Sequence, residues 1–217
     1  MRKLLALAIL SVLSVGFSGS QAPHADRYLD LVQRLKSGDR MVDFTEFRMA
    51  FVNSPEFRGP DSQLQERIKA AAGAHRYEEV LSIAAKMLDE NYTDALAHFH
   101  AYRAHKELGH KDEAAYHHFI LEGLASSIEK SGDGKSKASA YVVISTGEVL
   151  LPLFRGQVKE QSPFEIELIQ EGIHRWCTFT GVDARTNQRF TLFFNVDIPV
   201  SRVRDTLLKK KAVGATK

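Results

Sequence analysis

Four polar residues of this 217-residue chain could serve a binding site. Arg48 and Lys135 can hold an anionic group, and the carboxylates of Asp133 and Glu148 can accept a proton or pair with a cation. If the four side chains converge, the sequence predicts a small-ligand or enzyme site at the loop Ser131–Ser136. A second interpretation needs only Arg48, paired with Asp133 or Glu148 in a buried ion pair that fixes how helices dock on a sheet.

The motif Gly134-Lys135-Ser136 resembles the end of a phosphate-binding loop, but the rest of that loop is missing. A phosphate loop requires a glycine where Glu129 stands. A calcium loop would require a bidentate glutamate where Ala140 stands. The structural interpretation is that Gly132 ends the preceding helix, and that Asp133 and Gly134 turn the chain into the first strand.

The remaining reactive residue types lack the neighbours that catalysis or metal binding needs. Cys177 is the only cysteine, so no intramolecular disulfide is possible, and we expect a buried, inert thiol. No His-Glu-x-x-His motif is present, and we interpret the histidines of the helical half as surface residues. The sequence therefore predicts no catalytic residue, no metal ligand and no cofactor. The histidines concerned are His75, His98, His100, His105, His110, His117 and His118.

Residues 23–130 show the apolar spacing of helices. In the first predicted helix, apolar residues recur from Tyr28 to Leu35 at i, i+3, i+4 and i+7, and Gly38 follows the helix as a stop signal. Asp43 is a favourable N-cap for a second, short helix, with Glu46 at the spacing of a capping box. Further helices are predicted after Ser62, the last three over about 77–90, 94–108 and 112–129.

Part of this helical region resembles tetratricopeptide repeats. Tyr77 and Lys111 are 34 residues apart, which is the period of that repeat. The segment Tyr77–Asp94 resembles the second helix of one repeat, and Ala95–Leu124 resembles a complete second repeat. Because so few repeats cannot bury their apolar faces alone, the neighbouring elements must cover them.

Residues 131–200 change to the two-residue alternation of strands. Phe164, Ile166 and Leu168 alternate with glutamates, and Asp183–Gln188 forms a polar turn before the last strand. Helices followed by successive strands predict an α+β fold. We expect an N-terminal helical region and a C-terminal antiparallel β-meander packed on the helices as one compact unit. The strands are predicted over about 140–145, 164–168, 176–180 and 190–196.

The two ends of the chain have their own character. Residues 1–22 carry Arg2 and Lys3 followed by an uncharged apolar run, the layout of a secretory signal peptide, with cleavage expected at Ser20 or Ala22. Removing this segment leaves equal numbers of basic and acidic residues, which argues against nucleic-acid binding. Residues 201–217 form a basic tail that could touch an anionic surface, although such tails are more often solvated ends. Its central cations are Lys209, Lys210 and Lys211.

Four stretches together resemble an uncharacterised bacterial family, the domain of unknown function 4919 family. The resemblance covers roughly residues 27–200 and implies a secreted α+β bacterial protein without an assigned activity. The stretches are 43–48 with Ser54-Pro55, 131–136, 140–145 with Glu148, and 192–199.

These observations favour a periplasmic or secreted, non-enzymatic module that binds a protein or peptide of the cell envelope. The repeat-like period and the missing catalytic motifs support this hypothesis. The alternative is a small-ligand binder or enzyme at the Ser131–Ser136 loop, with Arg48, Asp133, Lys135 and Glu148 as candidate ligand-binding residues.

Overall fold

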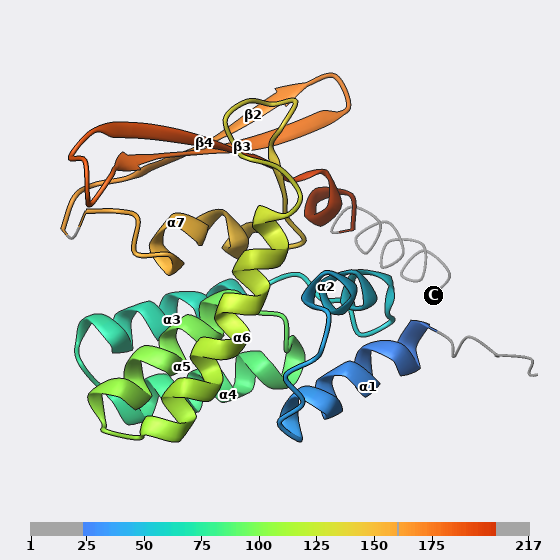
Figure 1. The fold of residues 1–217 in the computed structure, drawn as a ribbon, viewed down its shortest axis with the longest axis vertical. Coiled ribbons are helices and arrows are strands. Elements are labelled where there is room, and N and C mark those ends of the chain that lie inside the picture. The colour runs from blue at the N-terminus through green and yellow to red at the C-terminus, as the bar shows by residue number, and fades with distance from the viewer. Residues whose placement is uncertain (1–23, 160, 203–217) are drawn as a thin grey trace, which may run out of the picture.

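The computed structural model describes residues 24–159 and 161–202. A layer of helices carries a four-stranded sheet on one side, and a short helical segment lies between the two (Figure 1). The helices are α1 (His24–Lys36), α2 (Phe44–Asn53), α3 (Ser62–Gly73), α4 (Tyr77–Glu90), α5 (Ala95–Glu107), α6 (Lys111–Glu129), the 3₁₀ segment η1 (Thr146–Leu150) and α7 (Leu151–Phe154). The strands are β1 (Tyr141–Val142), β2 (Glu165–Glu171), β3 (His174–Val182) and β4 (Arg189–Asn195).

Local sequence signals set the ends of the first helices. Gly38 follows α1 with φ of +88°, a conformation that glycine adopts at little cost. The Asp43 carboxylate accepts hydrogen bonds from the backbone N–H groups of Thr45 and Glu46, so the predicted N-cap is present. The Glu46 carboxylate, at the capping-box position, pairs with Arg27 of α1 at 2.7 Å and so ties the first two helices together.

The helices α4, α5 and α6 pack in sequence as antiparallel neighbours. The two residues one repeat period apart, Tyr77 and Lys111, are the first residues of α4 and α6. Helix α6 also crosses α2 closely at Gly123, where an added Cβ would lie 2.2 Å from the ring of Phe44. A larger residue at this crossing, in the middle of the longest described helix, would force the half-buried Phe44 ring to move.

The sheet has the strand order β1-β4-β3-β2. The predicted antiparallel meander holds for β2, β3 and β4, with Ile166 opposite Phe179 and Cys177 opposite Phe194. Strand β1 is shorter than predicted and joins β4 in parallel, with Tyr141 opposite Phe194, so the sheet is mixed. The turn after β3 is built by the Asp183 carboxylate, which accepts two backbone N–H groups at its start.

The helices and the sheet share one core. Ile128 of α6 packs with Phe179 of β3 and Phe194 of β4, and none of the three side chains is measurably exposed. The predicted divisions at residues 23–130 and 131–200 thus lie in elements that pack on each other. The predicted signal peptide of residues 1–22 and the lysines at 209–211 lie outside the described residues.

The loop after α6 uses its glycines differently from our prediction. Helix α6 ends at Glu129 with Lys130 as its C-cap, so Gly132 is not the residue that terminates it. Gly132 is instead required by close packing, because a Cβ there would lie 2.3 Å from the carbonyl oxygen of Ser139. Gly134 has φ of +68°, and its carbonyl accepts the N–H of Phe193 at 2.7 Å, which anchors the loop to β4.

Candidate functional site

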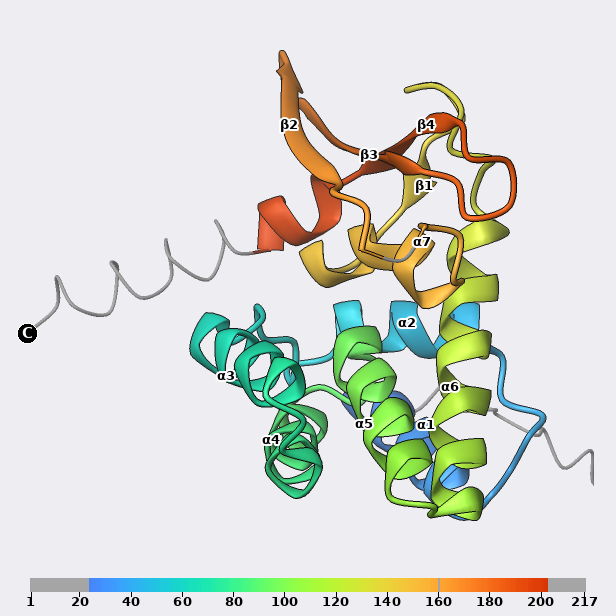
Figure 2. The ribbon, with the colours of Figure 1, turned by 90° about the vertical axis from the view of Figure 1, so that its left-hand side faces the viewer.

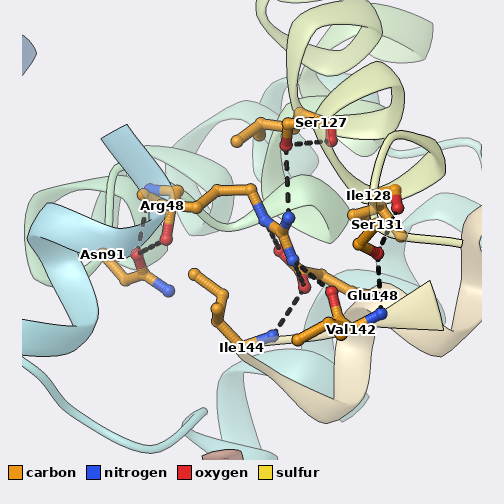
Figure 3. A network of polar contacts seen from close by, with 10 residues as sticks. Arg48, Asn91, Ser127, Ile128, Ser131, Val142, Ile144 and Glu148 are labelled. Atoms are coloured by element: carbon orange, nitrogen blue, oxygen red, sulfur yellow. Dashed lines mark hydrogen bonds and ion pairs between the residues drawn. The ribbon is translucent and has the colours of Figure 1, made fainter. Parts of the chain in front are cut away.

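Arg48 and Glu148, 100 residues apart in the chain, form a buried ion pair between α2 and η1 (Figure 3). The guanidinium donates from Nε to Oε1 at 2.9 Å and from Nη2 to Oε2 at 2.7 Å, a two-point geometry. The side chains are 5% and 0% exposed. Both charged groups are therefore shielded from solvent.

The surrounding backbone and side chains satisfy the remaining polar atoms of the pair. Arg48 also donates to the carbonyl of Val142 at 2.9 Å and to Oγ of Ser127 at 3.3 Å. Glu148 also accepts the N–H of Ile144 at 2.8 Å. The network therefore joins α2, α6, β1 and η1 at the junction of the helical layer and the sheet (Figure 3). Ser127 and the Val142 carbonyl were not among the predicted residues, although a serine within the apolar run of α6 was a visible signal.

Asp133 and Lys135 lie in the loop Ser131–Ser136 at the surface. Their side chains are 54% and 81% exposed and face each other at 3.8 Å. The Asp133 carboxylate also accepts a hydrogen bond from the hydroxyl of Ser139 at 2.6 Å. This hydrogen bond is the largest cause that lowers the pKa of Asp133. The four predicted residues thus form two separate pairs, one buried and one exposed. In each pair the charged groups already interact with each other. As a ligand-binding set they stay a prediction.

The helices α5 and α6 contain a row of histidines that corrects our surface interpretation. His98 is completely buried, with Nε2 at 3.1 Å from the Tyr92 carbonyl and Nδ1 at 2.9 Å from Nδ1 of His117. His105 stacks on His117 and lies 3.2 Å from His110, nitrogen to nitrogen. Burial, reinforced by the neighbouring His117, lowers the pKa of His98 to about 3. Burial, with a smaller contribution from the neighbouring His105, lowers the pKa of His117 to about 4.

An open groove of about 590 Å³ lies between α3, α4 and α5; we call it the helical groove. Its apolar lining comes from Ala72, Val80 and Ala104. Its polar lining includes Lys69, His100, Arg103 and Glu107. Burial, with smaller contributions from the two cations, lowers the pKa of His100 to about 4. The groove therefore combines apolar surface with two cations and one carboxylate.

The described part of the chain contains neither a metal-binding cluster nor a membrane-spanning helix. No group of three or more histidine, cysteine or acidic residues is placed to hold a metal ion among residues 24–159 and 161–202. Within the same residues, no helix is long and apolar enough to span a bilayer.

Comparison with known proteins gives one match. The model of a family described as "Domain of unknown function (DUF4919)" matches residues 22–197, a span that contains all four predicted site residues and the helical groove. No curated protein and no solved structure matches the chain.

Proposed function

We propose that this chain, which belongs to the domain of unknown function 4919 family, is an exported, non-enzymatic module that binds a protein or peptide segment in the cell envelope. The observation that supports this most is the helical groove. A cleft between helices that is lined by apolar side chains and a few polar groups is a common place for ligands to bind. At about 590 Å³ it has room for a few side chains of a partner.

The polar side of the groove indicates which segment would fit. Lys69 from α3 and Arg103 from α5 lie close enough to His100 to disfavour its protonated form. A carboxylate bound between them would be attracted by both cations and would remove that disadvantage. We therefore propose an occupant that carries an acidic side chain or a free carboxyl terminus beside apolar residues.

The groove is tested by charge reversal. We expect the double variant Lys69→Glu and Arg103→Glu to bind the probe peptide Leu-Asp-Val-Glu-Leu about tenfold more weakly than the unchanged protein, because two attractions become repulsions. The matched control is Lys86→Glu, an exposed lysine of α4 that does not line the groove. Fluorescence anisotropy of the labelled peptide at low salt gives the dissociation constants. Equal weakening by the control would show only a general charge effect and would contradict the proposal.

A second readout uses the native surroundings. The mature protein is cross-linked in the cell envelope and recovered, and its partners are identified by mass spectrometry. A partner kept by the Lys86→Glu control and lost by the double variant would support binding through the groove. Partners that survive both substitutions would place the interaction elsewhere on the molecule.

Export is a separate part of the proposal and rests on residues 1–22. We expect the protein to be found in the envelope or secreted fraction with a new N-terminus just after Ser20 or Ala22. N-terminal sequencing of protein recovered from fractionated cells measures this. An intact Met1 in the soluble cytoplasmic fraction would contradict export. It would leave the proposal about the helical groove unaffected.

A further inference from the structure

Strand β2 lies at the edge of the sheet. In the described part of the chain it pairs with β3 and with no other strand. It is seven residues long, contains neither lysine nor proline, and rises away from the helical layer (Figure 2). An edge strand presents backbone N–H and C=O groups that another strand can pair with, and lysine or proline commonly blocks such pairing. The edge formed by β2 has neither a lysine nor a proline to block such pairing.

One face of β2 is apolar and uncovered. Ile166 lies opposite Phe179, and Leu168 lies opposite Cys177. Directly opposite residues share a sheet face, so these side chains lie on the face that packs on the helices. Phe179 is fully buried there, whereas Ile166 is 45% and Leu168 is 63% exposed. The apolar row therefore continues beyond the part of the sheet that the helices cover.

Phe164, just before β2, extends the same row. Its ring stacks on that of Phe179 with centroids 5.1 Å apart, yet the residue is 41% exposed. Three large apolar side chains thus stand together at the uncovered margin of a sheet, an arrangement that marks interaction surfaces in soluble proteins.

The opposite face of β2 carries acids. Glu165, Glu167 and Glu171 lie on this face together with the half-buried Ile169, and all three glutamates are exposed. Glu165 pairs with Arg189 at 2.8 Å and Glu171 with Lys137, both at the surface, where such pairs are weak and exchange readily. Glu167 lies between them, opposite Thr178. A strand added to this edge would meet negative charge on one face and apolar surface on the other.

A second copy of the chain does not fit this edge. An antiparallel pairing centred on Leu168 keeps the two apolar rows on one face but sets Glu165 of each copy opposite Glu171 of the other, and like charges directly opposite are destabilising. Shifting the register by one residue moves each glutamate row onto the other copy's apolar face. Neither of these two registers therefore serves both rows.

We propose that β2 accepts, as an added strand, an extended segment of another protein in which lysine or arginine alternates with valine, isoleucine or leucine. The backbone of the segment would complete the ladder at the edge. Its apolar side chains would cover Ile166 and Leu168, and its cations would lie along the three glutamates. Addition of a strand to an exposed edge is a general mode of peptide recognition in which alternate side chains give the specificity.

The test uses a blocked heptapeptide, Lys-Val-Lys-Ile-Lys-Val-Lys, and its counterpart with glutamate in place of lysine. We expect the lysine peptide to bind the full chain and the glutamate peptide to bind at least tenfold more weakly. Hydrogen exchange of the amides at 165–171 should slow when the lysine peptide is present, while exchange in α4 stays unchanged. Glu167→Lys should weaken binding about tenfold, and Leu168→Asn several-fold, because both residues are exposed and neither supports the fold.

The matched control is Glu78→Lys, which makes the same charge change at an exposed position of α4. If Glu78→Lys weakens binding as much as Glu167→Lys, or if exchange at 165–171 is unaffected, the peptide binds by general charge attraction and the proposal is wrong. A dimer in analytical ultracentrifugation that Leu168→Asn dissociates would assign the edge to a second copy and also overturn it. The groove variants at Lys69 and Arg103 leave β2 unchanged, so failure of either site is seen independently of the other.

Discussion

Replacing Arg48 with methionine is expected to lower the free energy of unfolding by about 3–5 kcal/mol. The cause is the partner left behind: the Glu148 carboxylate is 0% exposed and would remain buried without its counter-charge. The Val142 carbonyl would lose its donor as well. Urea unfolding of Arg48→Met, followed by circular dichroism, measures the change.

Two further variants separate this cause from others. Adding Glu148→Gln to Arg48→Met removes the stranded charge, and the amide oxygen can still accept the N–H of Ile144, so we expect about half of the loss to be recovered. Arg27→Met breaks an exposed pair with Glu46 and should cost less than about 1 kcal/mol. If Arg48→Met costs no more than Arg27→Met, the buried pair does not hold the helices to the sheet.

This result also bears on the four residues selected from the sequence. A site that binds a small ligand through Arg48 must expose it, and the structure places Arg48 where four hydrogen bonds to Glu148, Val142 and Ser127 occupy its donors. The pairing of Arg48 with Glu148 was one of the sequence interpretations. That interpretation included a buried pair, but the sequence could not choose Glu148 over Asp133, because the choice depends on how α2, α6 and η1 meet.

The elements that local chemistry determines were predicted well from sequence. Asp43 caps α2 as expected, and the strand alternation from Phe164 onward located the start of β2 within one residue, although β2 continues three residues beyond the predicted end. Strand β1 was less predictable: the apolar run at 140–145 gives only two paired residues, because Val143 packs in the core beneath the sheet and Ile144 packs in the core of the helices. A short apolar run cannot reveal which strand it will join, or in which direction.

The histidines show the same limit of prediction from local sequence. His98 and His117 are 19 residues apart on different helices, and no spacing rule connects them. The sequence therefore suggested surface positions, whereas packing of α5 on α6 brings the half-buried ring of His117 against the completely buried His98. The glutamates that alternate with Ile166 and Leu168 are exposed, whereas the exposure of the apolar row on the other face became visible only with the strand order.

Acidification is expected to destabilise the fold strongly through these histidines. Their folded pKa values, about 3 for His98 and about 4 for His117 and His100, lie below the value near 6.5 of an unfolded histidine. Below pH 6.5 the unfolded chain therefore binds more protons than the folded one. The stability that neutral histidines contribute is complete above pH 6.5 and is lost as the pH falls towards 4.

One group works in the opposite direction. Burial raises the pKa of Asp94, the N-cap of α5, to about 6, so its protonation favours the folded state as the pH falls. Three histidines against one aspartate leave a net of two protons, each contributing about 1.4 kcal/mol for every pH unit. Between pH 6 and pH 4.5, we expect the free energy of unfolding to fall by roughly 2–3 kcal/mol per pH unit.

Urea unfolding at intervals from pH 7 to pH 4.5 measures this slope, and two variants assign it. His98→Gln keeps a neutral hydrogen-bonding side chain, so its stability at pH 7 should fall while its slope becomes shallower by about one proton. His117→Gln removes the ring that faces His98 and should also make the slope shallower by about one proton. If His98→Gln is as acid-sensitive as the unchanged protein, the contact between His98 and His117 is not what acid breaks. A shallower slope would instead identify the packing of α5 on α6, beside the helical groove, as the acid-sensitive part of the fold.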